Sequence, residues 1–284
     1  MYKHVIYIVC LLFCFVACQE DLHEGREEIV VEGWIESGGA PVVILTKSFT
    51  VTTKEMADEE ESIVLPWGKV TVSDGTQSVV LTGDYDDRYV PPYIYSTSKM
   101  SGVPGRTYYL TIEYGGRVVT SHTTIPMPDS LEALTVTPCE EVDSMYQITA
   151  HFDDEPSTKD YYMFLTRIFN RETRYYPSFL SVVDDEYLTL HNQQVVQPGI
   201  HLLTSEDNRY RPYYREADSV QIKFAKIDAT TYDIHKSYSE MLGLAANPIF
   251  SSDISMLTNI QGGLGYWCGY AVTKYNVIIA DSIK

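Results

Sequence analysis

Cysteine and basic side chains are both scarce in this sequence, and each shortage excludes functions. Of five cysteines in 284 residues, only Cys139 and Cys268 follow position 18. Without a CxxC pair they make neither a disulfide framework nor a four-cysteine zinc site. Lys and Arg number 21 against 39 Asp and Glu, which gives a formal net charge of −18 at pH 7. Because nucleic-acid binding neutralises phosphates with basic side chains, this charge argues against a nucleic-acid ligand.

Recognisable catalytic and metal-binding motifs are missing as well. The seven histidines are scattered, with no HxH or HExxH pair, and there is no GxSxG sequence. The acidic groups at 84–87 and 153–155 do not match the twelve-residue EF-hand loop, so we expect no metal and no cofactor. Cys268 lies in a glycine-rich turn, where it is a nucleophile only if a histidine lies beside it. We therefore expect a protein without enzymatic activity. A hydrolase is the less favoured alternative, because catalytic carboxylates can come from distant positions.

The one long apolar run lies at the start of the sequence. Val5–Ala17 is apolar almost throughout, follows Lys3 and ends at Cys18. It is shorter than the roughly 20 residues that span a bilayer and has the proportions of a secretory signal. The small residue before Cys18 resembles the bacterial lipoprotein signal, in which the cysteine is acylated and becomes the N-terminus. We expect residues 1–17 to be the signal peptide, Cys18 to carry the lipid and 18–27 to be a tether. A short uncleaved anchor and ordinary secretory cleavage are the alternatives.

Residues 28–126 show the pattern of short strands separated by turns. The alternating run Lys69–Ser73 leads into Asp74-Gly75, a hairpin signal before Ser78–Thr82. Gly115-Gly116 supplies two residues that tolerate positive φ, and a two-residue turn there pairs Tyr114 with Arg117. About seven strands in about 100 residues, without a convincing helix, predict an immunoglobulin-like β-sandwich. A small open barrel is the alternative. Two prolines at 126 and 128 end this unit, which we expect to fold by itself.

Residues 131–284 predict a second, antiparallel β domain with one helix. Strands are expected at 131–137, 145–152, 161–170 and 219–227, and a last pair at 266–272 and 275–279. Asp228 is a plausible N-cap for a helix over 230–242, and Gly243 stops it. An exported location permits a Cys139–Cys268 disulfide, but two buried free thiols are favoured.

Tyrosine is abundant, with 23 residues, and it clusters with arginine between positions 171 and 215. The strand pattern is weak there, which indicates loops, and loops carry binding function disproportionately. Tyr and Arg are also the residue types enriched at binding hot spots. We therefore predict a contact surface there; edge-strand contacts and charge balance are the alternative. The predicted surface comprises Tyr175, Tyr176, Tyr210, Tyr213, Tyr214, Arg174 and Arg211.

Several short motifs occur in an order that resembles one family. They are VVEGWI at 30–35, PVVILTKS at 41–48, VTVSDG at 70–75, PGRTYYLTIEYGG at 104–116, TYDIHKSY at 231–238 and NIQGGLGYWCGY at 259–270. This ordered set is similar to the Bacteroidetes outer-membrane lipoproteins of domain of unknown function 4249. Two departures are Phe15, where such signals usually carry Leu, and the Trp-Cys pair at 267–268.

The resemblance implies a cellular setting. Such lipoproteins are commonly encoded beside TonB-dependent outer-membrane receptors, so the expected partners are the outer membrane, through the lipid, and such a receptor. The acidic residues after Cys18 resemble the signal for export to the cell surface, with the periplasmic leaflet as the alternative. We therefore expect a surface-tethered, non-enzymatic lipoprotein that captures a nutrient or contacts the receptor. A structural or adhesion lipoprotein without a transport partner is the main alternative.

Overall fold

The computed structural model describes residues 27–48, 63–140, 142–152, 159–184, 186, 192–199, 212–245 and 257–280. The expected signal peptide and Cys18 lie outside these residues. The described chain is mainly β with antiparallel sheets, as the sequence predicts. No helix in these ranges is both long and apolar enough to cross a membrane. Cys139 and Cys268 are both free thiols.

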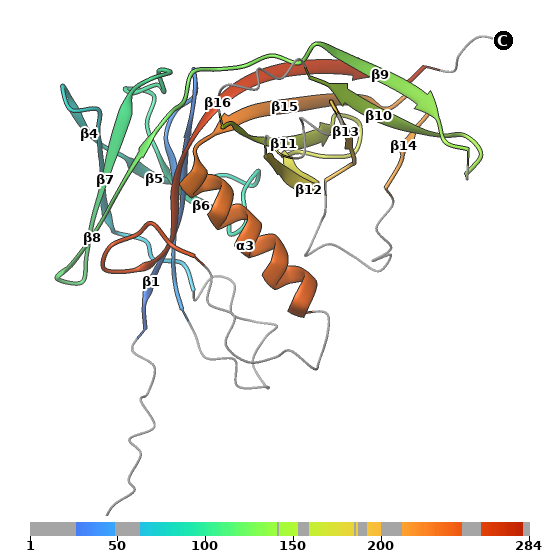
Figure 1. Cartoon of the computed structure of the whole chain (residues 1–284). Coiled ribbons are helices and arrows are strands. Elements are labelled where there is room, and N and C mark those ends of the chain that lie inside the picture. Colours follow the sequence, from blue (N-terminus) through green and yellow to red (C-terminus); the bar gives the residue numbers. More distant parts are fainter. Residues whose placement is uncertain are drawn as a thin grey trace, which may run out of the picture.

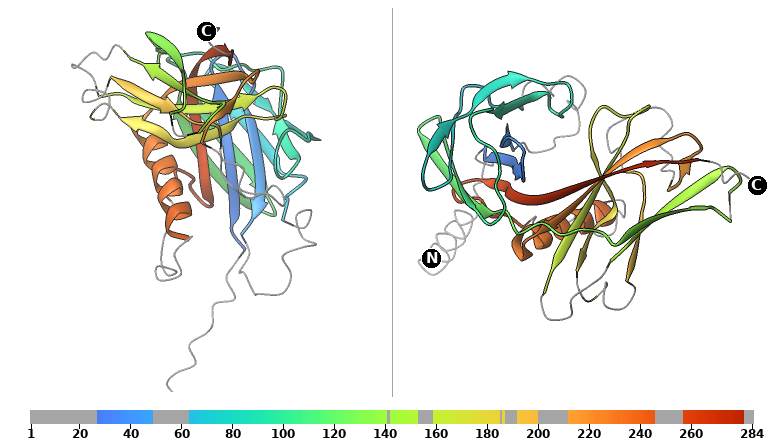
Figure 2. Two further views of the ribbon diagram at one scale, coloured as in Figure 1. Left: turned by 90° about the vertical axis from the view of Figure 1, so that its right-hand side faces the viewer. Right: turned by 90° about the horizontal axis from the view of Figure 1, so that it is seen from above.

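An eight-stranded sheet runs through the whole molecule (Figure 1). All its neighbouring strands are antiparallel except β1 and β16, which are parallel. The view from above in Figure 2 shows β16 crossing from one half of the molecule to the other. In spatial order the strands are β12 (Tyr176–Asp184), β11 (Tyr161–Ile168), β15 (Ser219–Ile227), β16 (Leu264–Ile278), β1 (Ile29–Glu36), β2 (Val42–Lys47), β6 (Tyr93–Ser96) and β5 (Thr82–Tyr85).

A first four-stranded sheet packs against the half of the large sheet that contains β1 and β2. Its order is β4 (Ser78–Val80), β3 (Lys69–Ser73), β7 (Thr107–Tyr114) and β8 (Arg117–Thr124). The two layers make the expected sandwich. The β7–β8 hairpin has the predicted register, with Tyr114 opposite Arg117. Gly115 and Gly116 take φ values of 56° and 76°, which glycine adopts without steric cost.

The core of this sandwich is not built from residues 28–126 alone. Ile260, Trp267 and Ala271 belong to the same buried cluster as Val31 and Tyr108. Trp267 is fully buried and its indole Nε1 donates to the Tyr108 carbonyl at 3.1 Å. The C-terminal strand therefore completes the N-terminal sandwich.

A second small sheet packs against the other half of the large sheet. It contains β13 (Gln193–Val196), β10 (Met145–His151) and β14 (Tyr214–Arg215), and β9 (Ala133–Pro138) pairs with β10. Its core includes Ile148, Phe164 and Phe224. The helix α3 (Ala229–Ala245) confirms the predicted helix over 230–242, and Asp228 Oδ1 accepts the Thr231 amide at 2.7 Å as an N-cap. The prediction that Gly243 stops the helix is wrong, because α3 continues through Gly243 to Ala245, and a glycine inside a helix costs only about 1 kcal/mol.

The predicted strand pair at 266–272 and 275–279 is wrong, because β16 is one continuous strand of 15 residues. Its register with β15 runs unbroken from Ala271 to Ile278. The intervening Thr273-Lys274 contains none of the residues that make a tight turn. These two polar residues are a half-buried and an exposed position within the strand.

The alternating side-chain directions of β16 show which face of the large sheet each small sheet covers. Side chains on one face enter the two cores, Trp267 and Ala271 in the first and Tyr275 and Val277 in the second. Because alternate residues of a strand point to opposite faces, both small sheets cover the same face of the large sheet. The opposite face carries Cys268 and Tyr270, which belong to a third cluster with α3.

Candidate functional site

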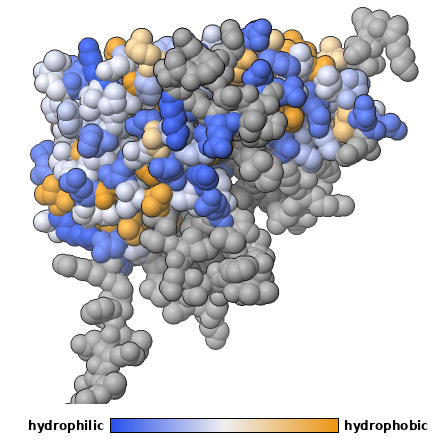
Figure 3. Space-filling model, viewed as in Figure 1, coloured by the Kyte–Doolittle hydropathy of each residue, from blue (hydrophilic) through white to orange (hydrophobic). Residues whose placement is uncertain are grey.

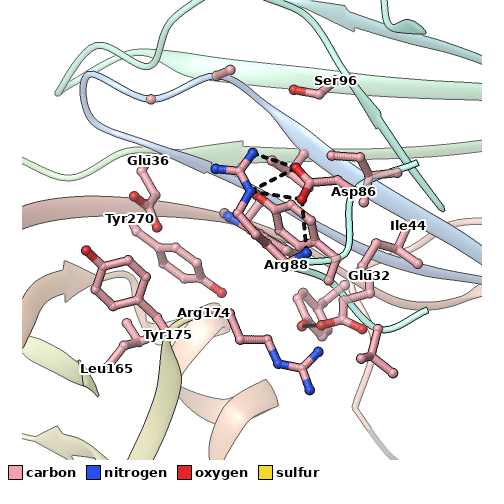
Figure 4. Close-up of a pocket in the computed structure, with 18 of the residues that line it drawn as sticks. Glu32, Glu36, Ile44, Asp86, Arg88, Ser96, Leu165, Arg174, Tyr175 and Tyr270 are labelled. Atoms are coloured by element: carbon pink, nitrogen blue, oxygen red, sulfur yellow. Dashed lines mark hydrogen bonds and ion pairs between the residues drawn. The ribbon is translucent and has the colours of Figure 1, made fainter. Parts of the chain in front are cut away.

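A large pocket lies on the face of the eight-stranded sheet that the small sheets leave open (Figure 4). Its volume is about 1050 Å³, and strands from both halves of the molecule line it together with α3. On β1 the side chains of Glu32, Trp34 and Glu36 face the pocket, whereas Val31 and Ile35 enter the first core. The strict alternation of β1 thus makes one strand both core and pocket wall.

A carboxyl group, two phenols and an imidazole meet in one part of the pocket. The Tyr266 hydroxyl donates to Glu32 Oε1 at 2.8 Å, and His235 Nε2 lies 2.9 Å from the Tyr270 hydroxyl. Burial raises the pKa of Glu32, although the bond from Tyr266 opposes that rise. Burial lowers the pKa of His235 to about 4. The imidazole is therefore neutral at pH 7 and serves as a hydrogen-bonding group.

A buried ion pair connects the two halves of the pocket. Lys223 Nζ on β15 lies 2.5 Å from Glu36 Oε1 on β1, and the side chains are 10% and 16% exposed. The same ammonium lies 4.0 Å from the centre of the Tyr175 ring, a cation–π contact. Burial lowers the pKa of Lys223, and the Glu36 carboxylate counteracts that effect. The Tyr175 hydroxyl donates to Gln221, which fixes the ring over Lys223.

A second ion pair and an aromatic pair lie near the edge of the large sheet. Arg88 donates to both carboxylate oxygens of Asp86 at distances from 2.5 to 3.1 Å. The ring centres of Trp34 and Tyr89 are 5.9 Å apart and tilted. A small buried cluster of Val42, Ile44 and Ile94 supplies the apolar wall beside them.

Three of the predicted contact residues line this pocket: Arg174, Tyr175 and Tyr176. Arg174 Nε donates to the Tyr176 hydroxyl at 2.8 Å, and its guanidinium carbon lies 5.0 Å from the centre of that ring. Tyr213 is half-buried and lies outside the pocket lining. Tyr210, Arg211 and the lipidation residue Cys18 lie outside the described residues.

The prediction that Tyr214 lies on a contact surface is wrong. Tyr214 is completely buried in the second core, and its hydroxyl donates to the Val196 carbonyl at 3.0 Å. It is the inward-facing residue of β14, and its neighbour Arg215 is exposed. Composition located the tyrosine-rich region but did not reveal which ring points inward.

Sequence reasoning missed most of the pocket residues. Glu32 and Glu36 lie on the same face of an otherwise apolar strand, a pattern that normally indicates the solvent-facing side of a sheet. The signal that distinguishes them is Trp34 between them on the same face, since a large aromatic side chain there indicates a covered or binding surface. Lys223 and Tyr270 carry no sequence signal, because their roles depend on strands distant in the chain.

The candidate nucleophile and the candidate metal ligands of the sequence take structural positions in the described residues. Cys268 is fully buried, and burial raises the pKa of its thiol to about 12, so the thiolate nucleophile considered above is not formed near neutral pH. His235 contacts Tyr270, not Cys268, in its one side-chain hydrogen bond of the described structure. Within the described ranges no three His, Cys, Asp or Glu residues gather into a metal site. Asp86, one of the acidic residues considered for calcium, pairs with Arg88.

Comparison with known proteins identifies the family. No curated protein matches this chain. A family model described as "Domain of unknown function (DUF4249)" matches residues 19–276 and so covers the sandwich, the second β half and every pocket strand. The chain belongs to the DUF4249 family.

Proposed function

We propose that this protein is a surface-anchored, non-enzymatic lipoprotein that captures a small ligand in the pocket and passes it to a TonB-dependent outer-membrane receptor. The observation that carries the proposal is the pocket of about 1050 Å³ on the open face of the large sheet. Ligand sites are concave, mostly apolar and lined by a few placed polar groups, with volumes of roughly 300–1,000 Å³. At about 1050 Å³ this pocket lies slightly above that range, so it has room for a sugar or a short peptide.

The polar groups of the pocket are held in place before any ligand arrives. Glu36 and Lys223 fix each other, and Glu32 is held by Tyr266. Ordered side chains lose little conformational entropy on binding, so a preorganised pocket favours affinity. Such an arrangement suits capture of a dilute ligand.

The N-terminal sequence supports the anchored location. The apolar run before Cys18 supplies the export signal, and acylation at this cysteine anchors the chain because each buried CH₂ contributes roughly 0.8 kcal/mol. Residues 18–27, fully extended, reach about 33–36 Å at roughly 3.3–3.6 Å per residue. This upper bound on the distance between the lipid and the folded part is compatible with contact between the folded part and a neighbouring receptor.

Figure 3 shows the described residues on one face of the molecule. On that face the apolar side chains of the described residues are scattered among polar ones and form no single dominant patch. Permanent complexes bury large apolar surfaces, so a transient contact with the receptor fits this face better.

Affinity purification from native outer membranes tests the proposal. Tagged wild-type protein should be acylated at Cys18, accessible to protease on intact cells and, after cross-linking on intact cells, co-purified with a TonB-dependent receptor. Cys18→Ser should remain unacylated and unprocessed, leave the outer-membrane fraction and lose the receptor. A Ser variant that partitions with outer membranes as wild type does contradicts the anchor, and a wild-type purification without such a receptor contradicts the transport role.

A further inference from the structure

We infer that the captured ligand carries a carboxylate and that Arg174 binds it. The inference rests on the proposed capture function and adds the chemical class of the ligand.

Two of the four cations in the pocket are neutralised and two are not. Lys223 pairs with Glu36, and Arg88 pairs with Asp86. Among the described residues no carboxylate lies within 4.0 Å of the guanidinium of Arg167 or of Arg174. Because an unpaired cation inside a pocket attracts anions, these two side chains set the preference of the site.

Among the described residues, Arg167 and Arg174 each make one hydrogen bond through Nε and one contact with an aromatic ring. Arg167 Nε donates to the Glu172 carbonyl at 3.1 Å, and its guanidinium carbon lies 4.9 Å from the centre of the Phe169 ring. Within the described ranges, Arg174 likewise bonds through Nε, which donates to the Tyr176 hydroxyl. Figure 4 shows its guanidinium extending into the open centre of the pocket. Both terminal nitrogens of Arg174 therefore remain for a ligand.

The acidic side chains do not offset this preference. Glu36 and Asp86 are paired, and Asp84 is exposed at the rim, where it accepts the amide of the next residue. The remaining carboxyl of the pocket lining, Glu32, accepts a hydrogen bond from Tyr266 and is therefore already engaged, and burial raises its pKa. The pocket interior thus prefers an anion, although the whole chain has a net charge of −18.

The geometry of Arg174 fits a carboxylate. Contact with the Tyr176 ring and the bond from Nε hold the guanidinium plane on one side. The two terminal nitrogens then form the planar fork that binds both oxygens of a carboxylate. Phosphate sites usually add backbone amides at a helix N-terminus or a glycine-rich loop, and Arg174 precedes a strand. The site therefore favours carboxylate over phosphate.

The rest of the ligand meets aromatic rings. Trp34, Tyr89, Tyr238 and Tyr266 line the same pocket. Their faces suit an apolar or ring-shaped body, and their polar tips supply hydrogen bonds. An acidic sugar and the C-terminal end of a short aromatic peptide share this chemistry: a carboxylate attached to a ring-bearing body.

Calorimetric titration of the folded full chain with two matched pairs tests the inference. One pair is glucuronate and glucuronamide; the other is an N-acetylated tripeptide with a central tryptophan, as free acid and as C-terminal amide. At least one acid should bind more tightly than its amide. Arg174→Gln should weaken that acid about 10- to 100-fold, since a charge-assisted hydrogen bond contributes about 1.5–3 kcal/mol, and Arg174→Lys should retain part of the affinity. Arg215→Gln, at an exposed arginine outside the pocket, is the matched control.

The outcomes distinguish an acidic glycan from a peptide C-terminus as the ligand, and they test the carboxylate inference separately from the capture function. Binding of glucuronate alone indicates an acidic glycan, and binding of the peptide acid alone indicates a peptide C-terminus; either supports the inference. Equal binding of acid and amide, no binding of either acid, an unchanged affinity in Arg174→Gln, or equal binding of inorganic phosphate overturns it. The capture function has its own readout, the ligand retained by protein from native membranes, and so survives or fails separately.

Discussion

Gly33 on β1 and Trp267 on β16 lie opposite each other on the parallel strand pair, and the tryptophan ring occupies the space beside the glycine backbone. A β carbon at Gly33 would lie 2.8 Å from Trp267 Cε3, closer than van der Waals contact permits. Trp267 is fully buried and bonds to Tyr108 on the small sheet. One close contact thus joins the first strand, the last strand and the sandwich partner of both.

Gly33→Ala should destabilise the protein by about 1–3 kcal/mol, because an added methyl group in a tightly filled core forces the ring or the strands to shift. Urea unfolding followed by circular dichroism measures the change. Ser78→Ala, at an exposed position of β4, is the control and should have little effect. If Gly33→Ala unfolds at the same urea concentration as wild type, the Trp267 ring has room to move.

A fragment of residues 26–126 should fail to fold cooperatively. The sequence alone suggests the opposite, since the prolines at 126 and 128 close a complete set of strands. Without β16, however, β1 exposes a long unpaired edge and the core lacks Trp267 and Ala271. Thermal unfolding of the purified fragment decides between the two expectations. A sharp transition would show that the sandwich is independent of the C-terminal strand.

Replacing one partner of the Glu36–Lys223 pair should lower the free energy of unfolding more than replacing both partners. Lys223→Met leaves the Glu36 carboxylate unpaired in a buried site, so we expect a loss of about 3–5 kcal/mol. The double variant Glu36→Gln, Lys223→Met should recover much of this loss, because neither charge is then buried alone. A double-mutant cycle in urea gives the coupling. Additive losses would mean that the pair contributes nothing beyond its separate side chains.

His235 should make the protein less stable in mild acid. Its pKa falls from the ordinary value of 6.5 to about 4 on folding, so between these pH values the unfolded chain binds a proton that the folded chain does not. The free energy of unfolding should therefore fall by about 3 kcal/mol as pH falls from 6.5 towards 4. Glu32, with a raised pKa, acts in the opposite direction.

Comparison of variants isolates the histidine. The difference in unfolding free energy between wild type and His235→Gln should change across pH 6.5 to 4. The difference for Ser78→Ala, at an exposed position without a titratable group, should stay constant. A difference for His235→Gln that stays constant with pH would contradict the buried, neutral state of this imidazole.

Local features of the fold were predictable because local residues determine them. Gly115-Gly116 fixes the β7–β8 register, and Asp228 fixes the start of α3. The parallel pairing of β1 with β16 was not predictable, since alternation tells which face a residue takes but not which strand lies beside it. For the same reason composition located the tyrosine-rich region but not which way each ring points: Tyr175 lines the pocket and Tyr214 enters a core. Glu32 and Glu36 were missed.

The most direct test of ligand capture is native mass spectrometry of the intact protein purified from its own outer membranes. Wild-type protein should carry a bound small molecule that dissociates on denaturation. Tyr238→Ala removes a partly exposed ring from the pocket wall, and Tyr109→Ala removes a similarly exposed ring from β7, outside the pocket. The account predicts that Tyr238→Ala loses the bound molecule while Tyr109→Ala keeps it, with both variants folded. Equal retention by the two variants, or a wild-type protein without any bound molecule, would contradict the capture function.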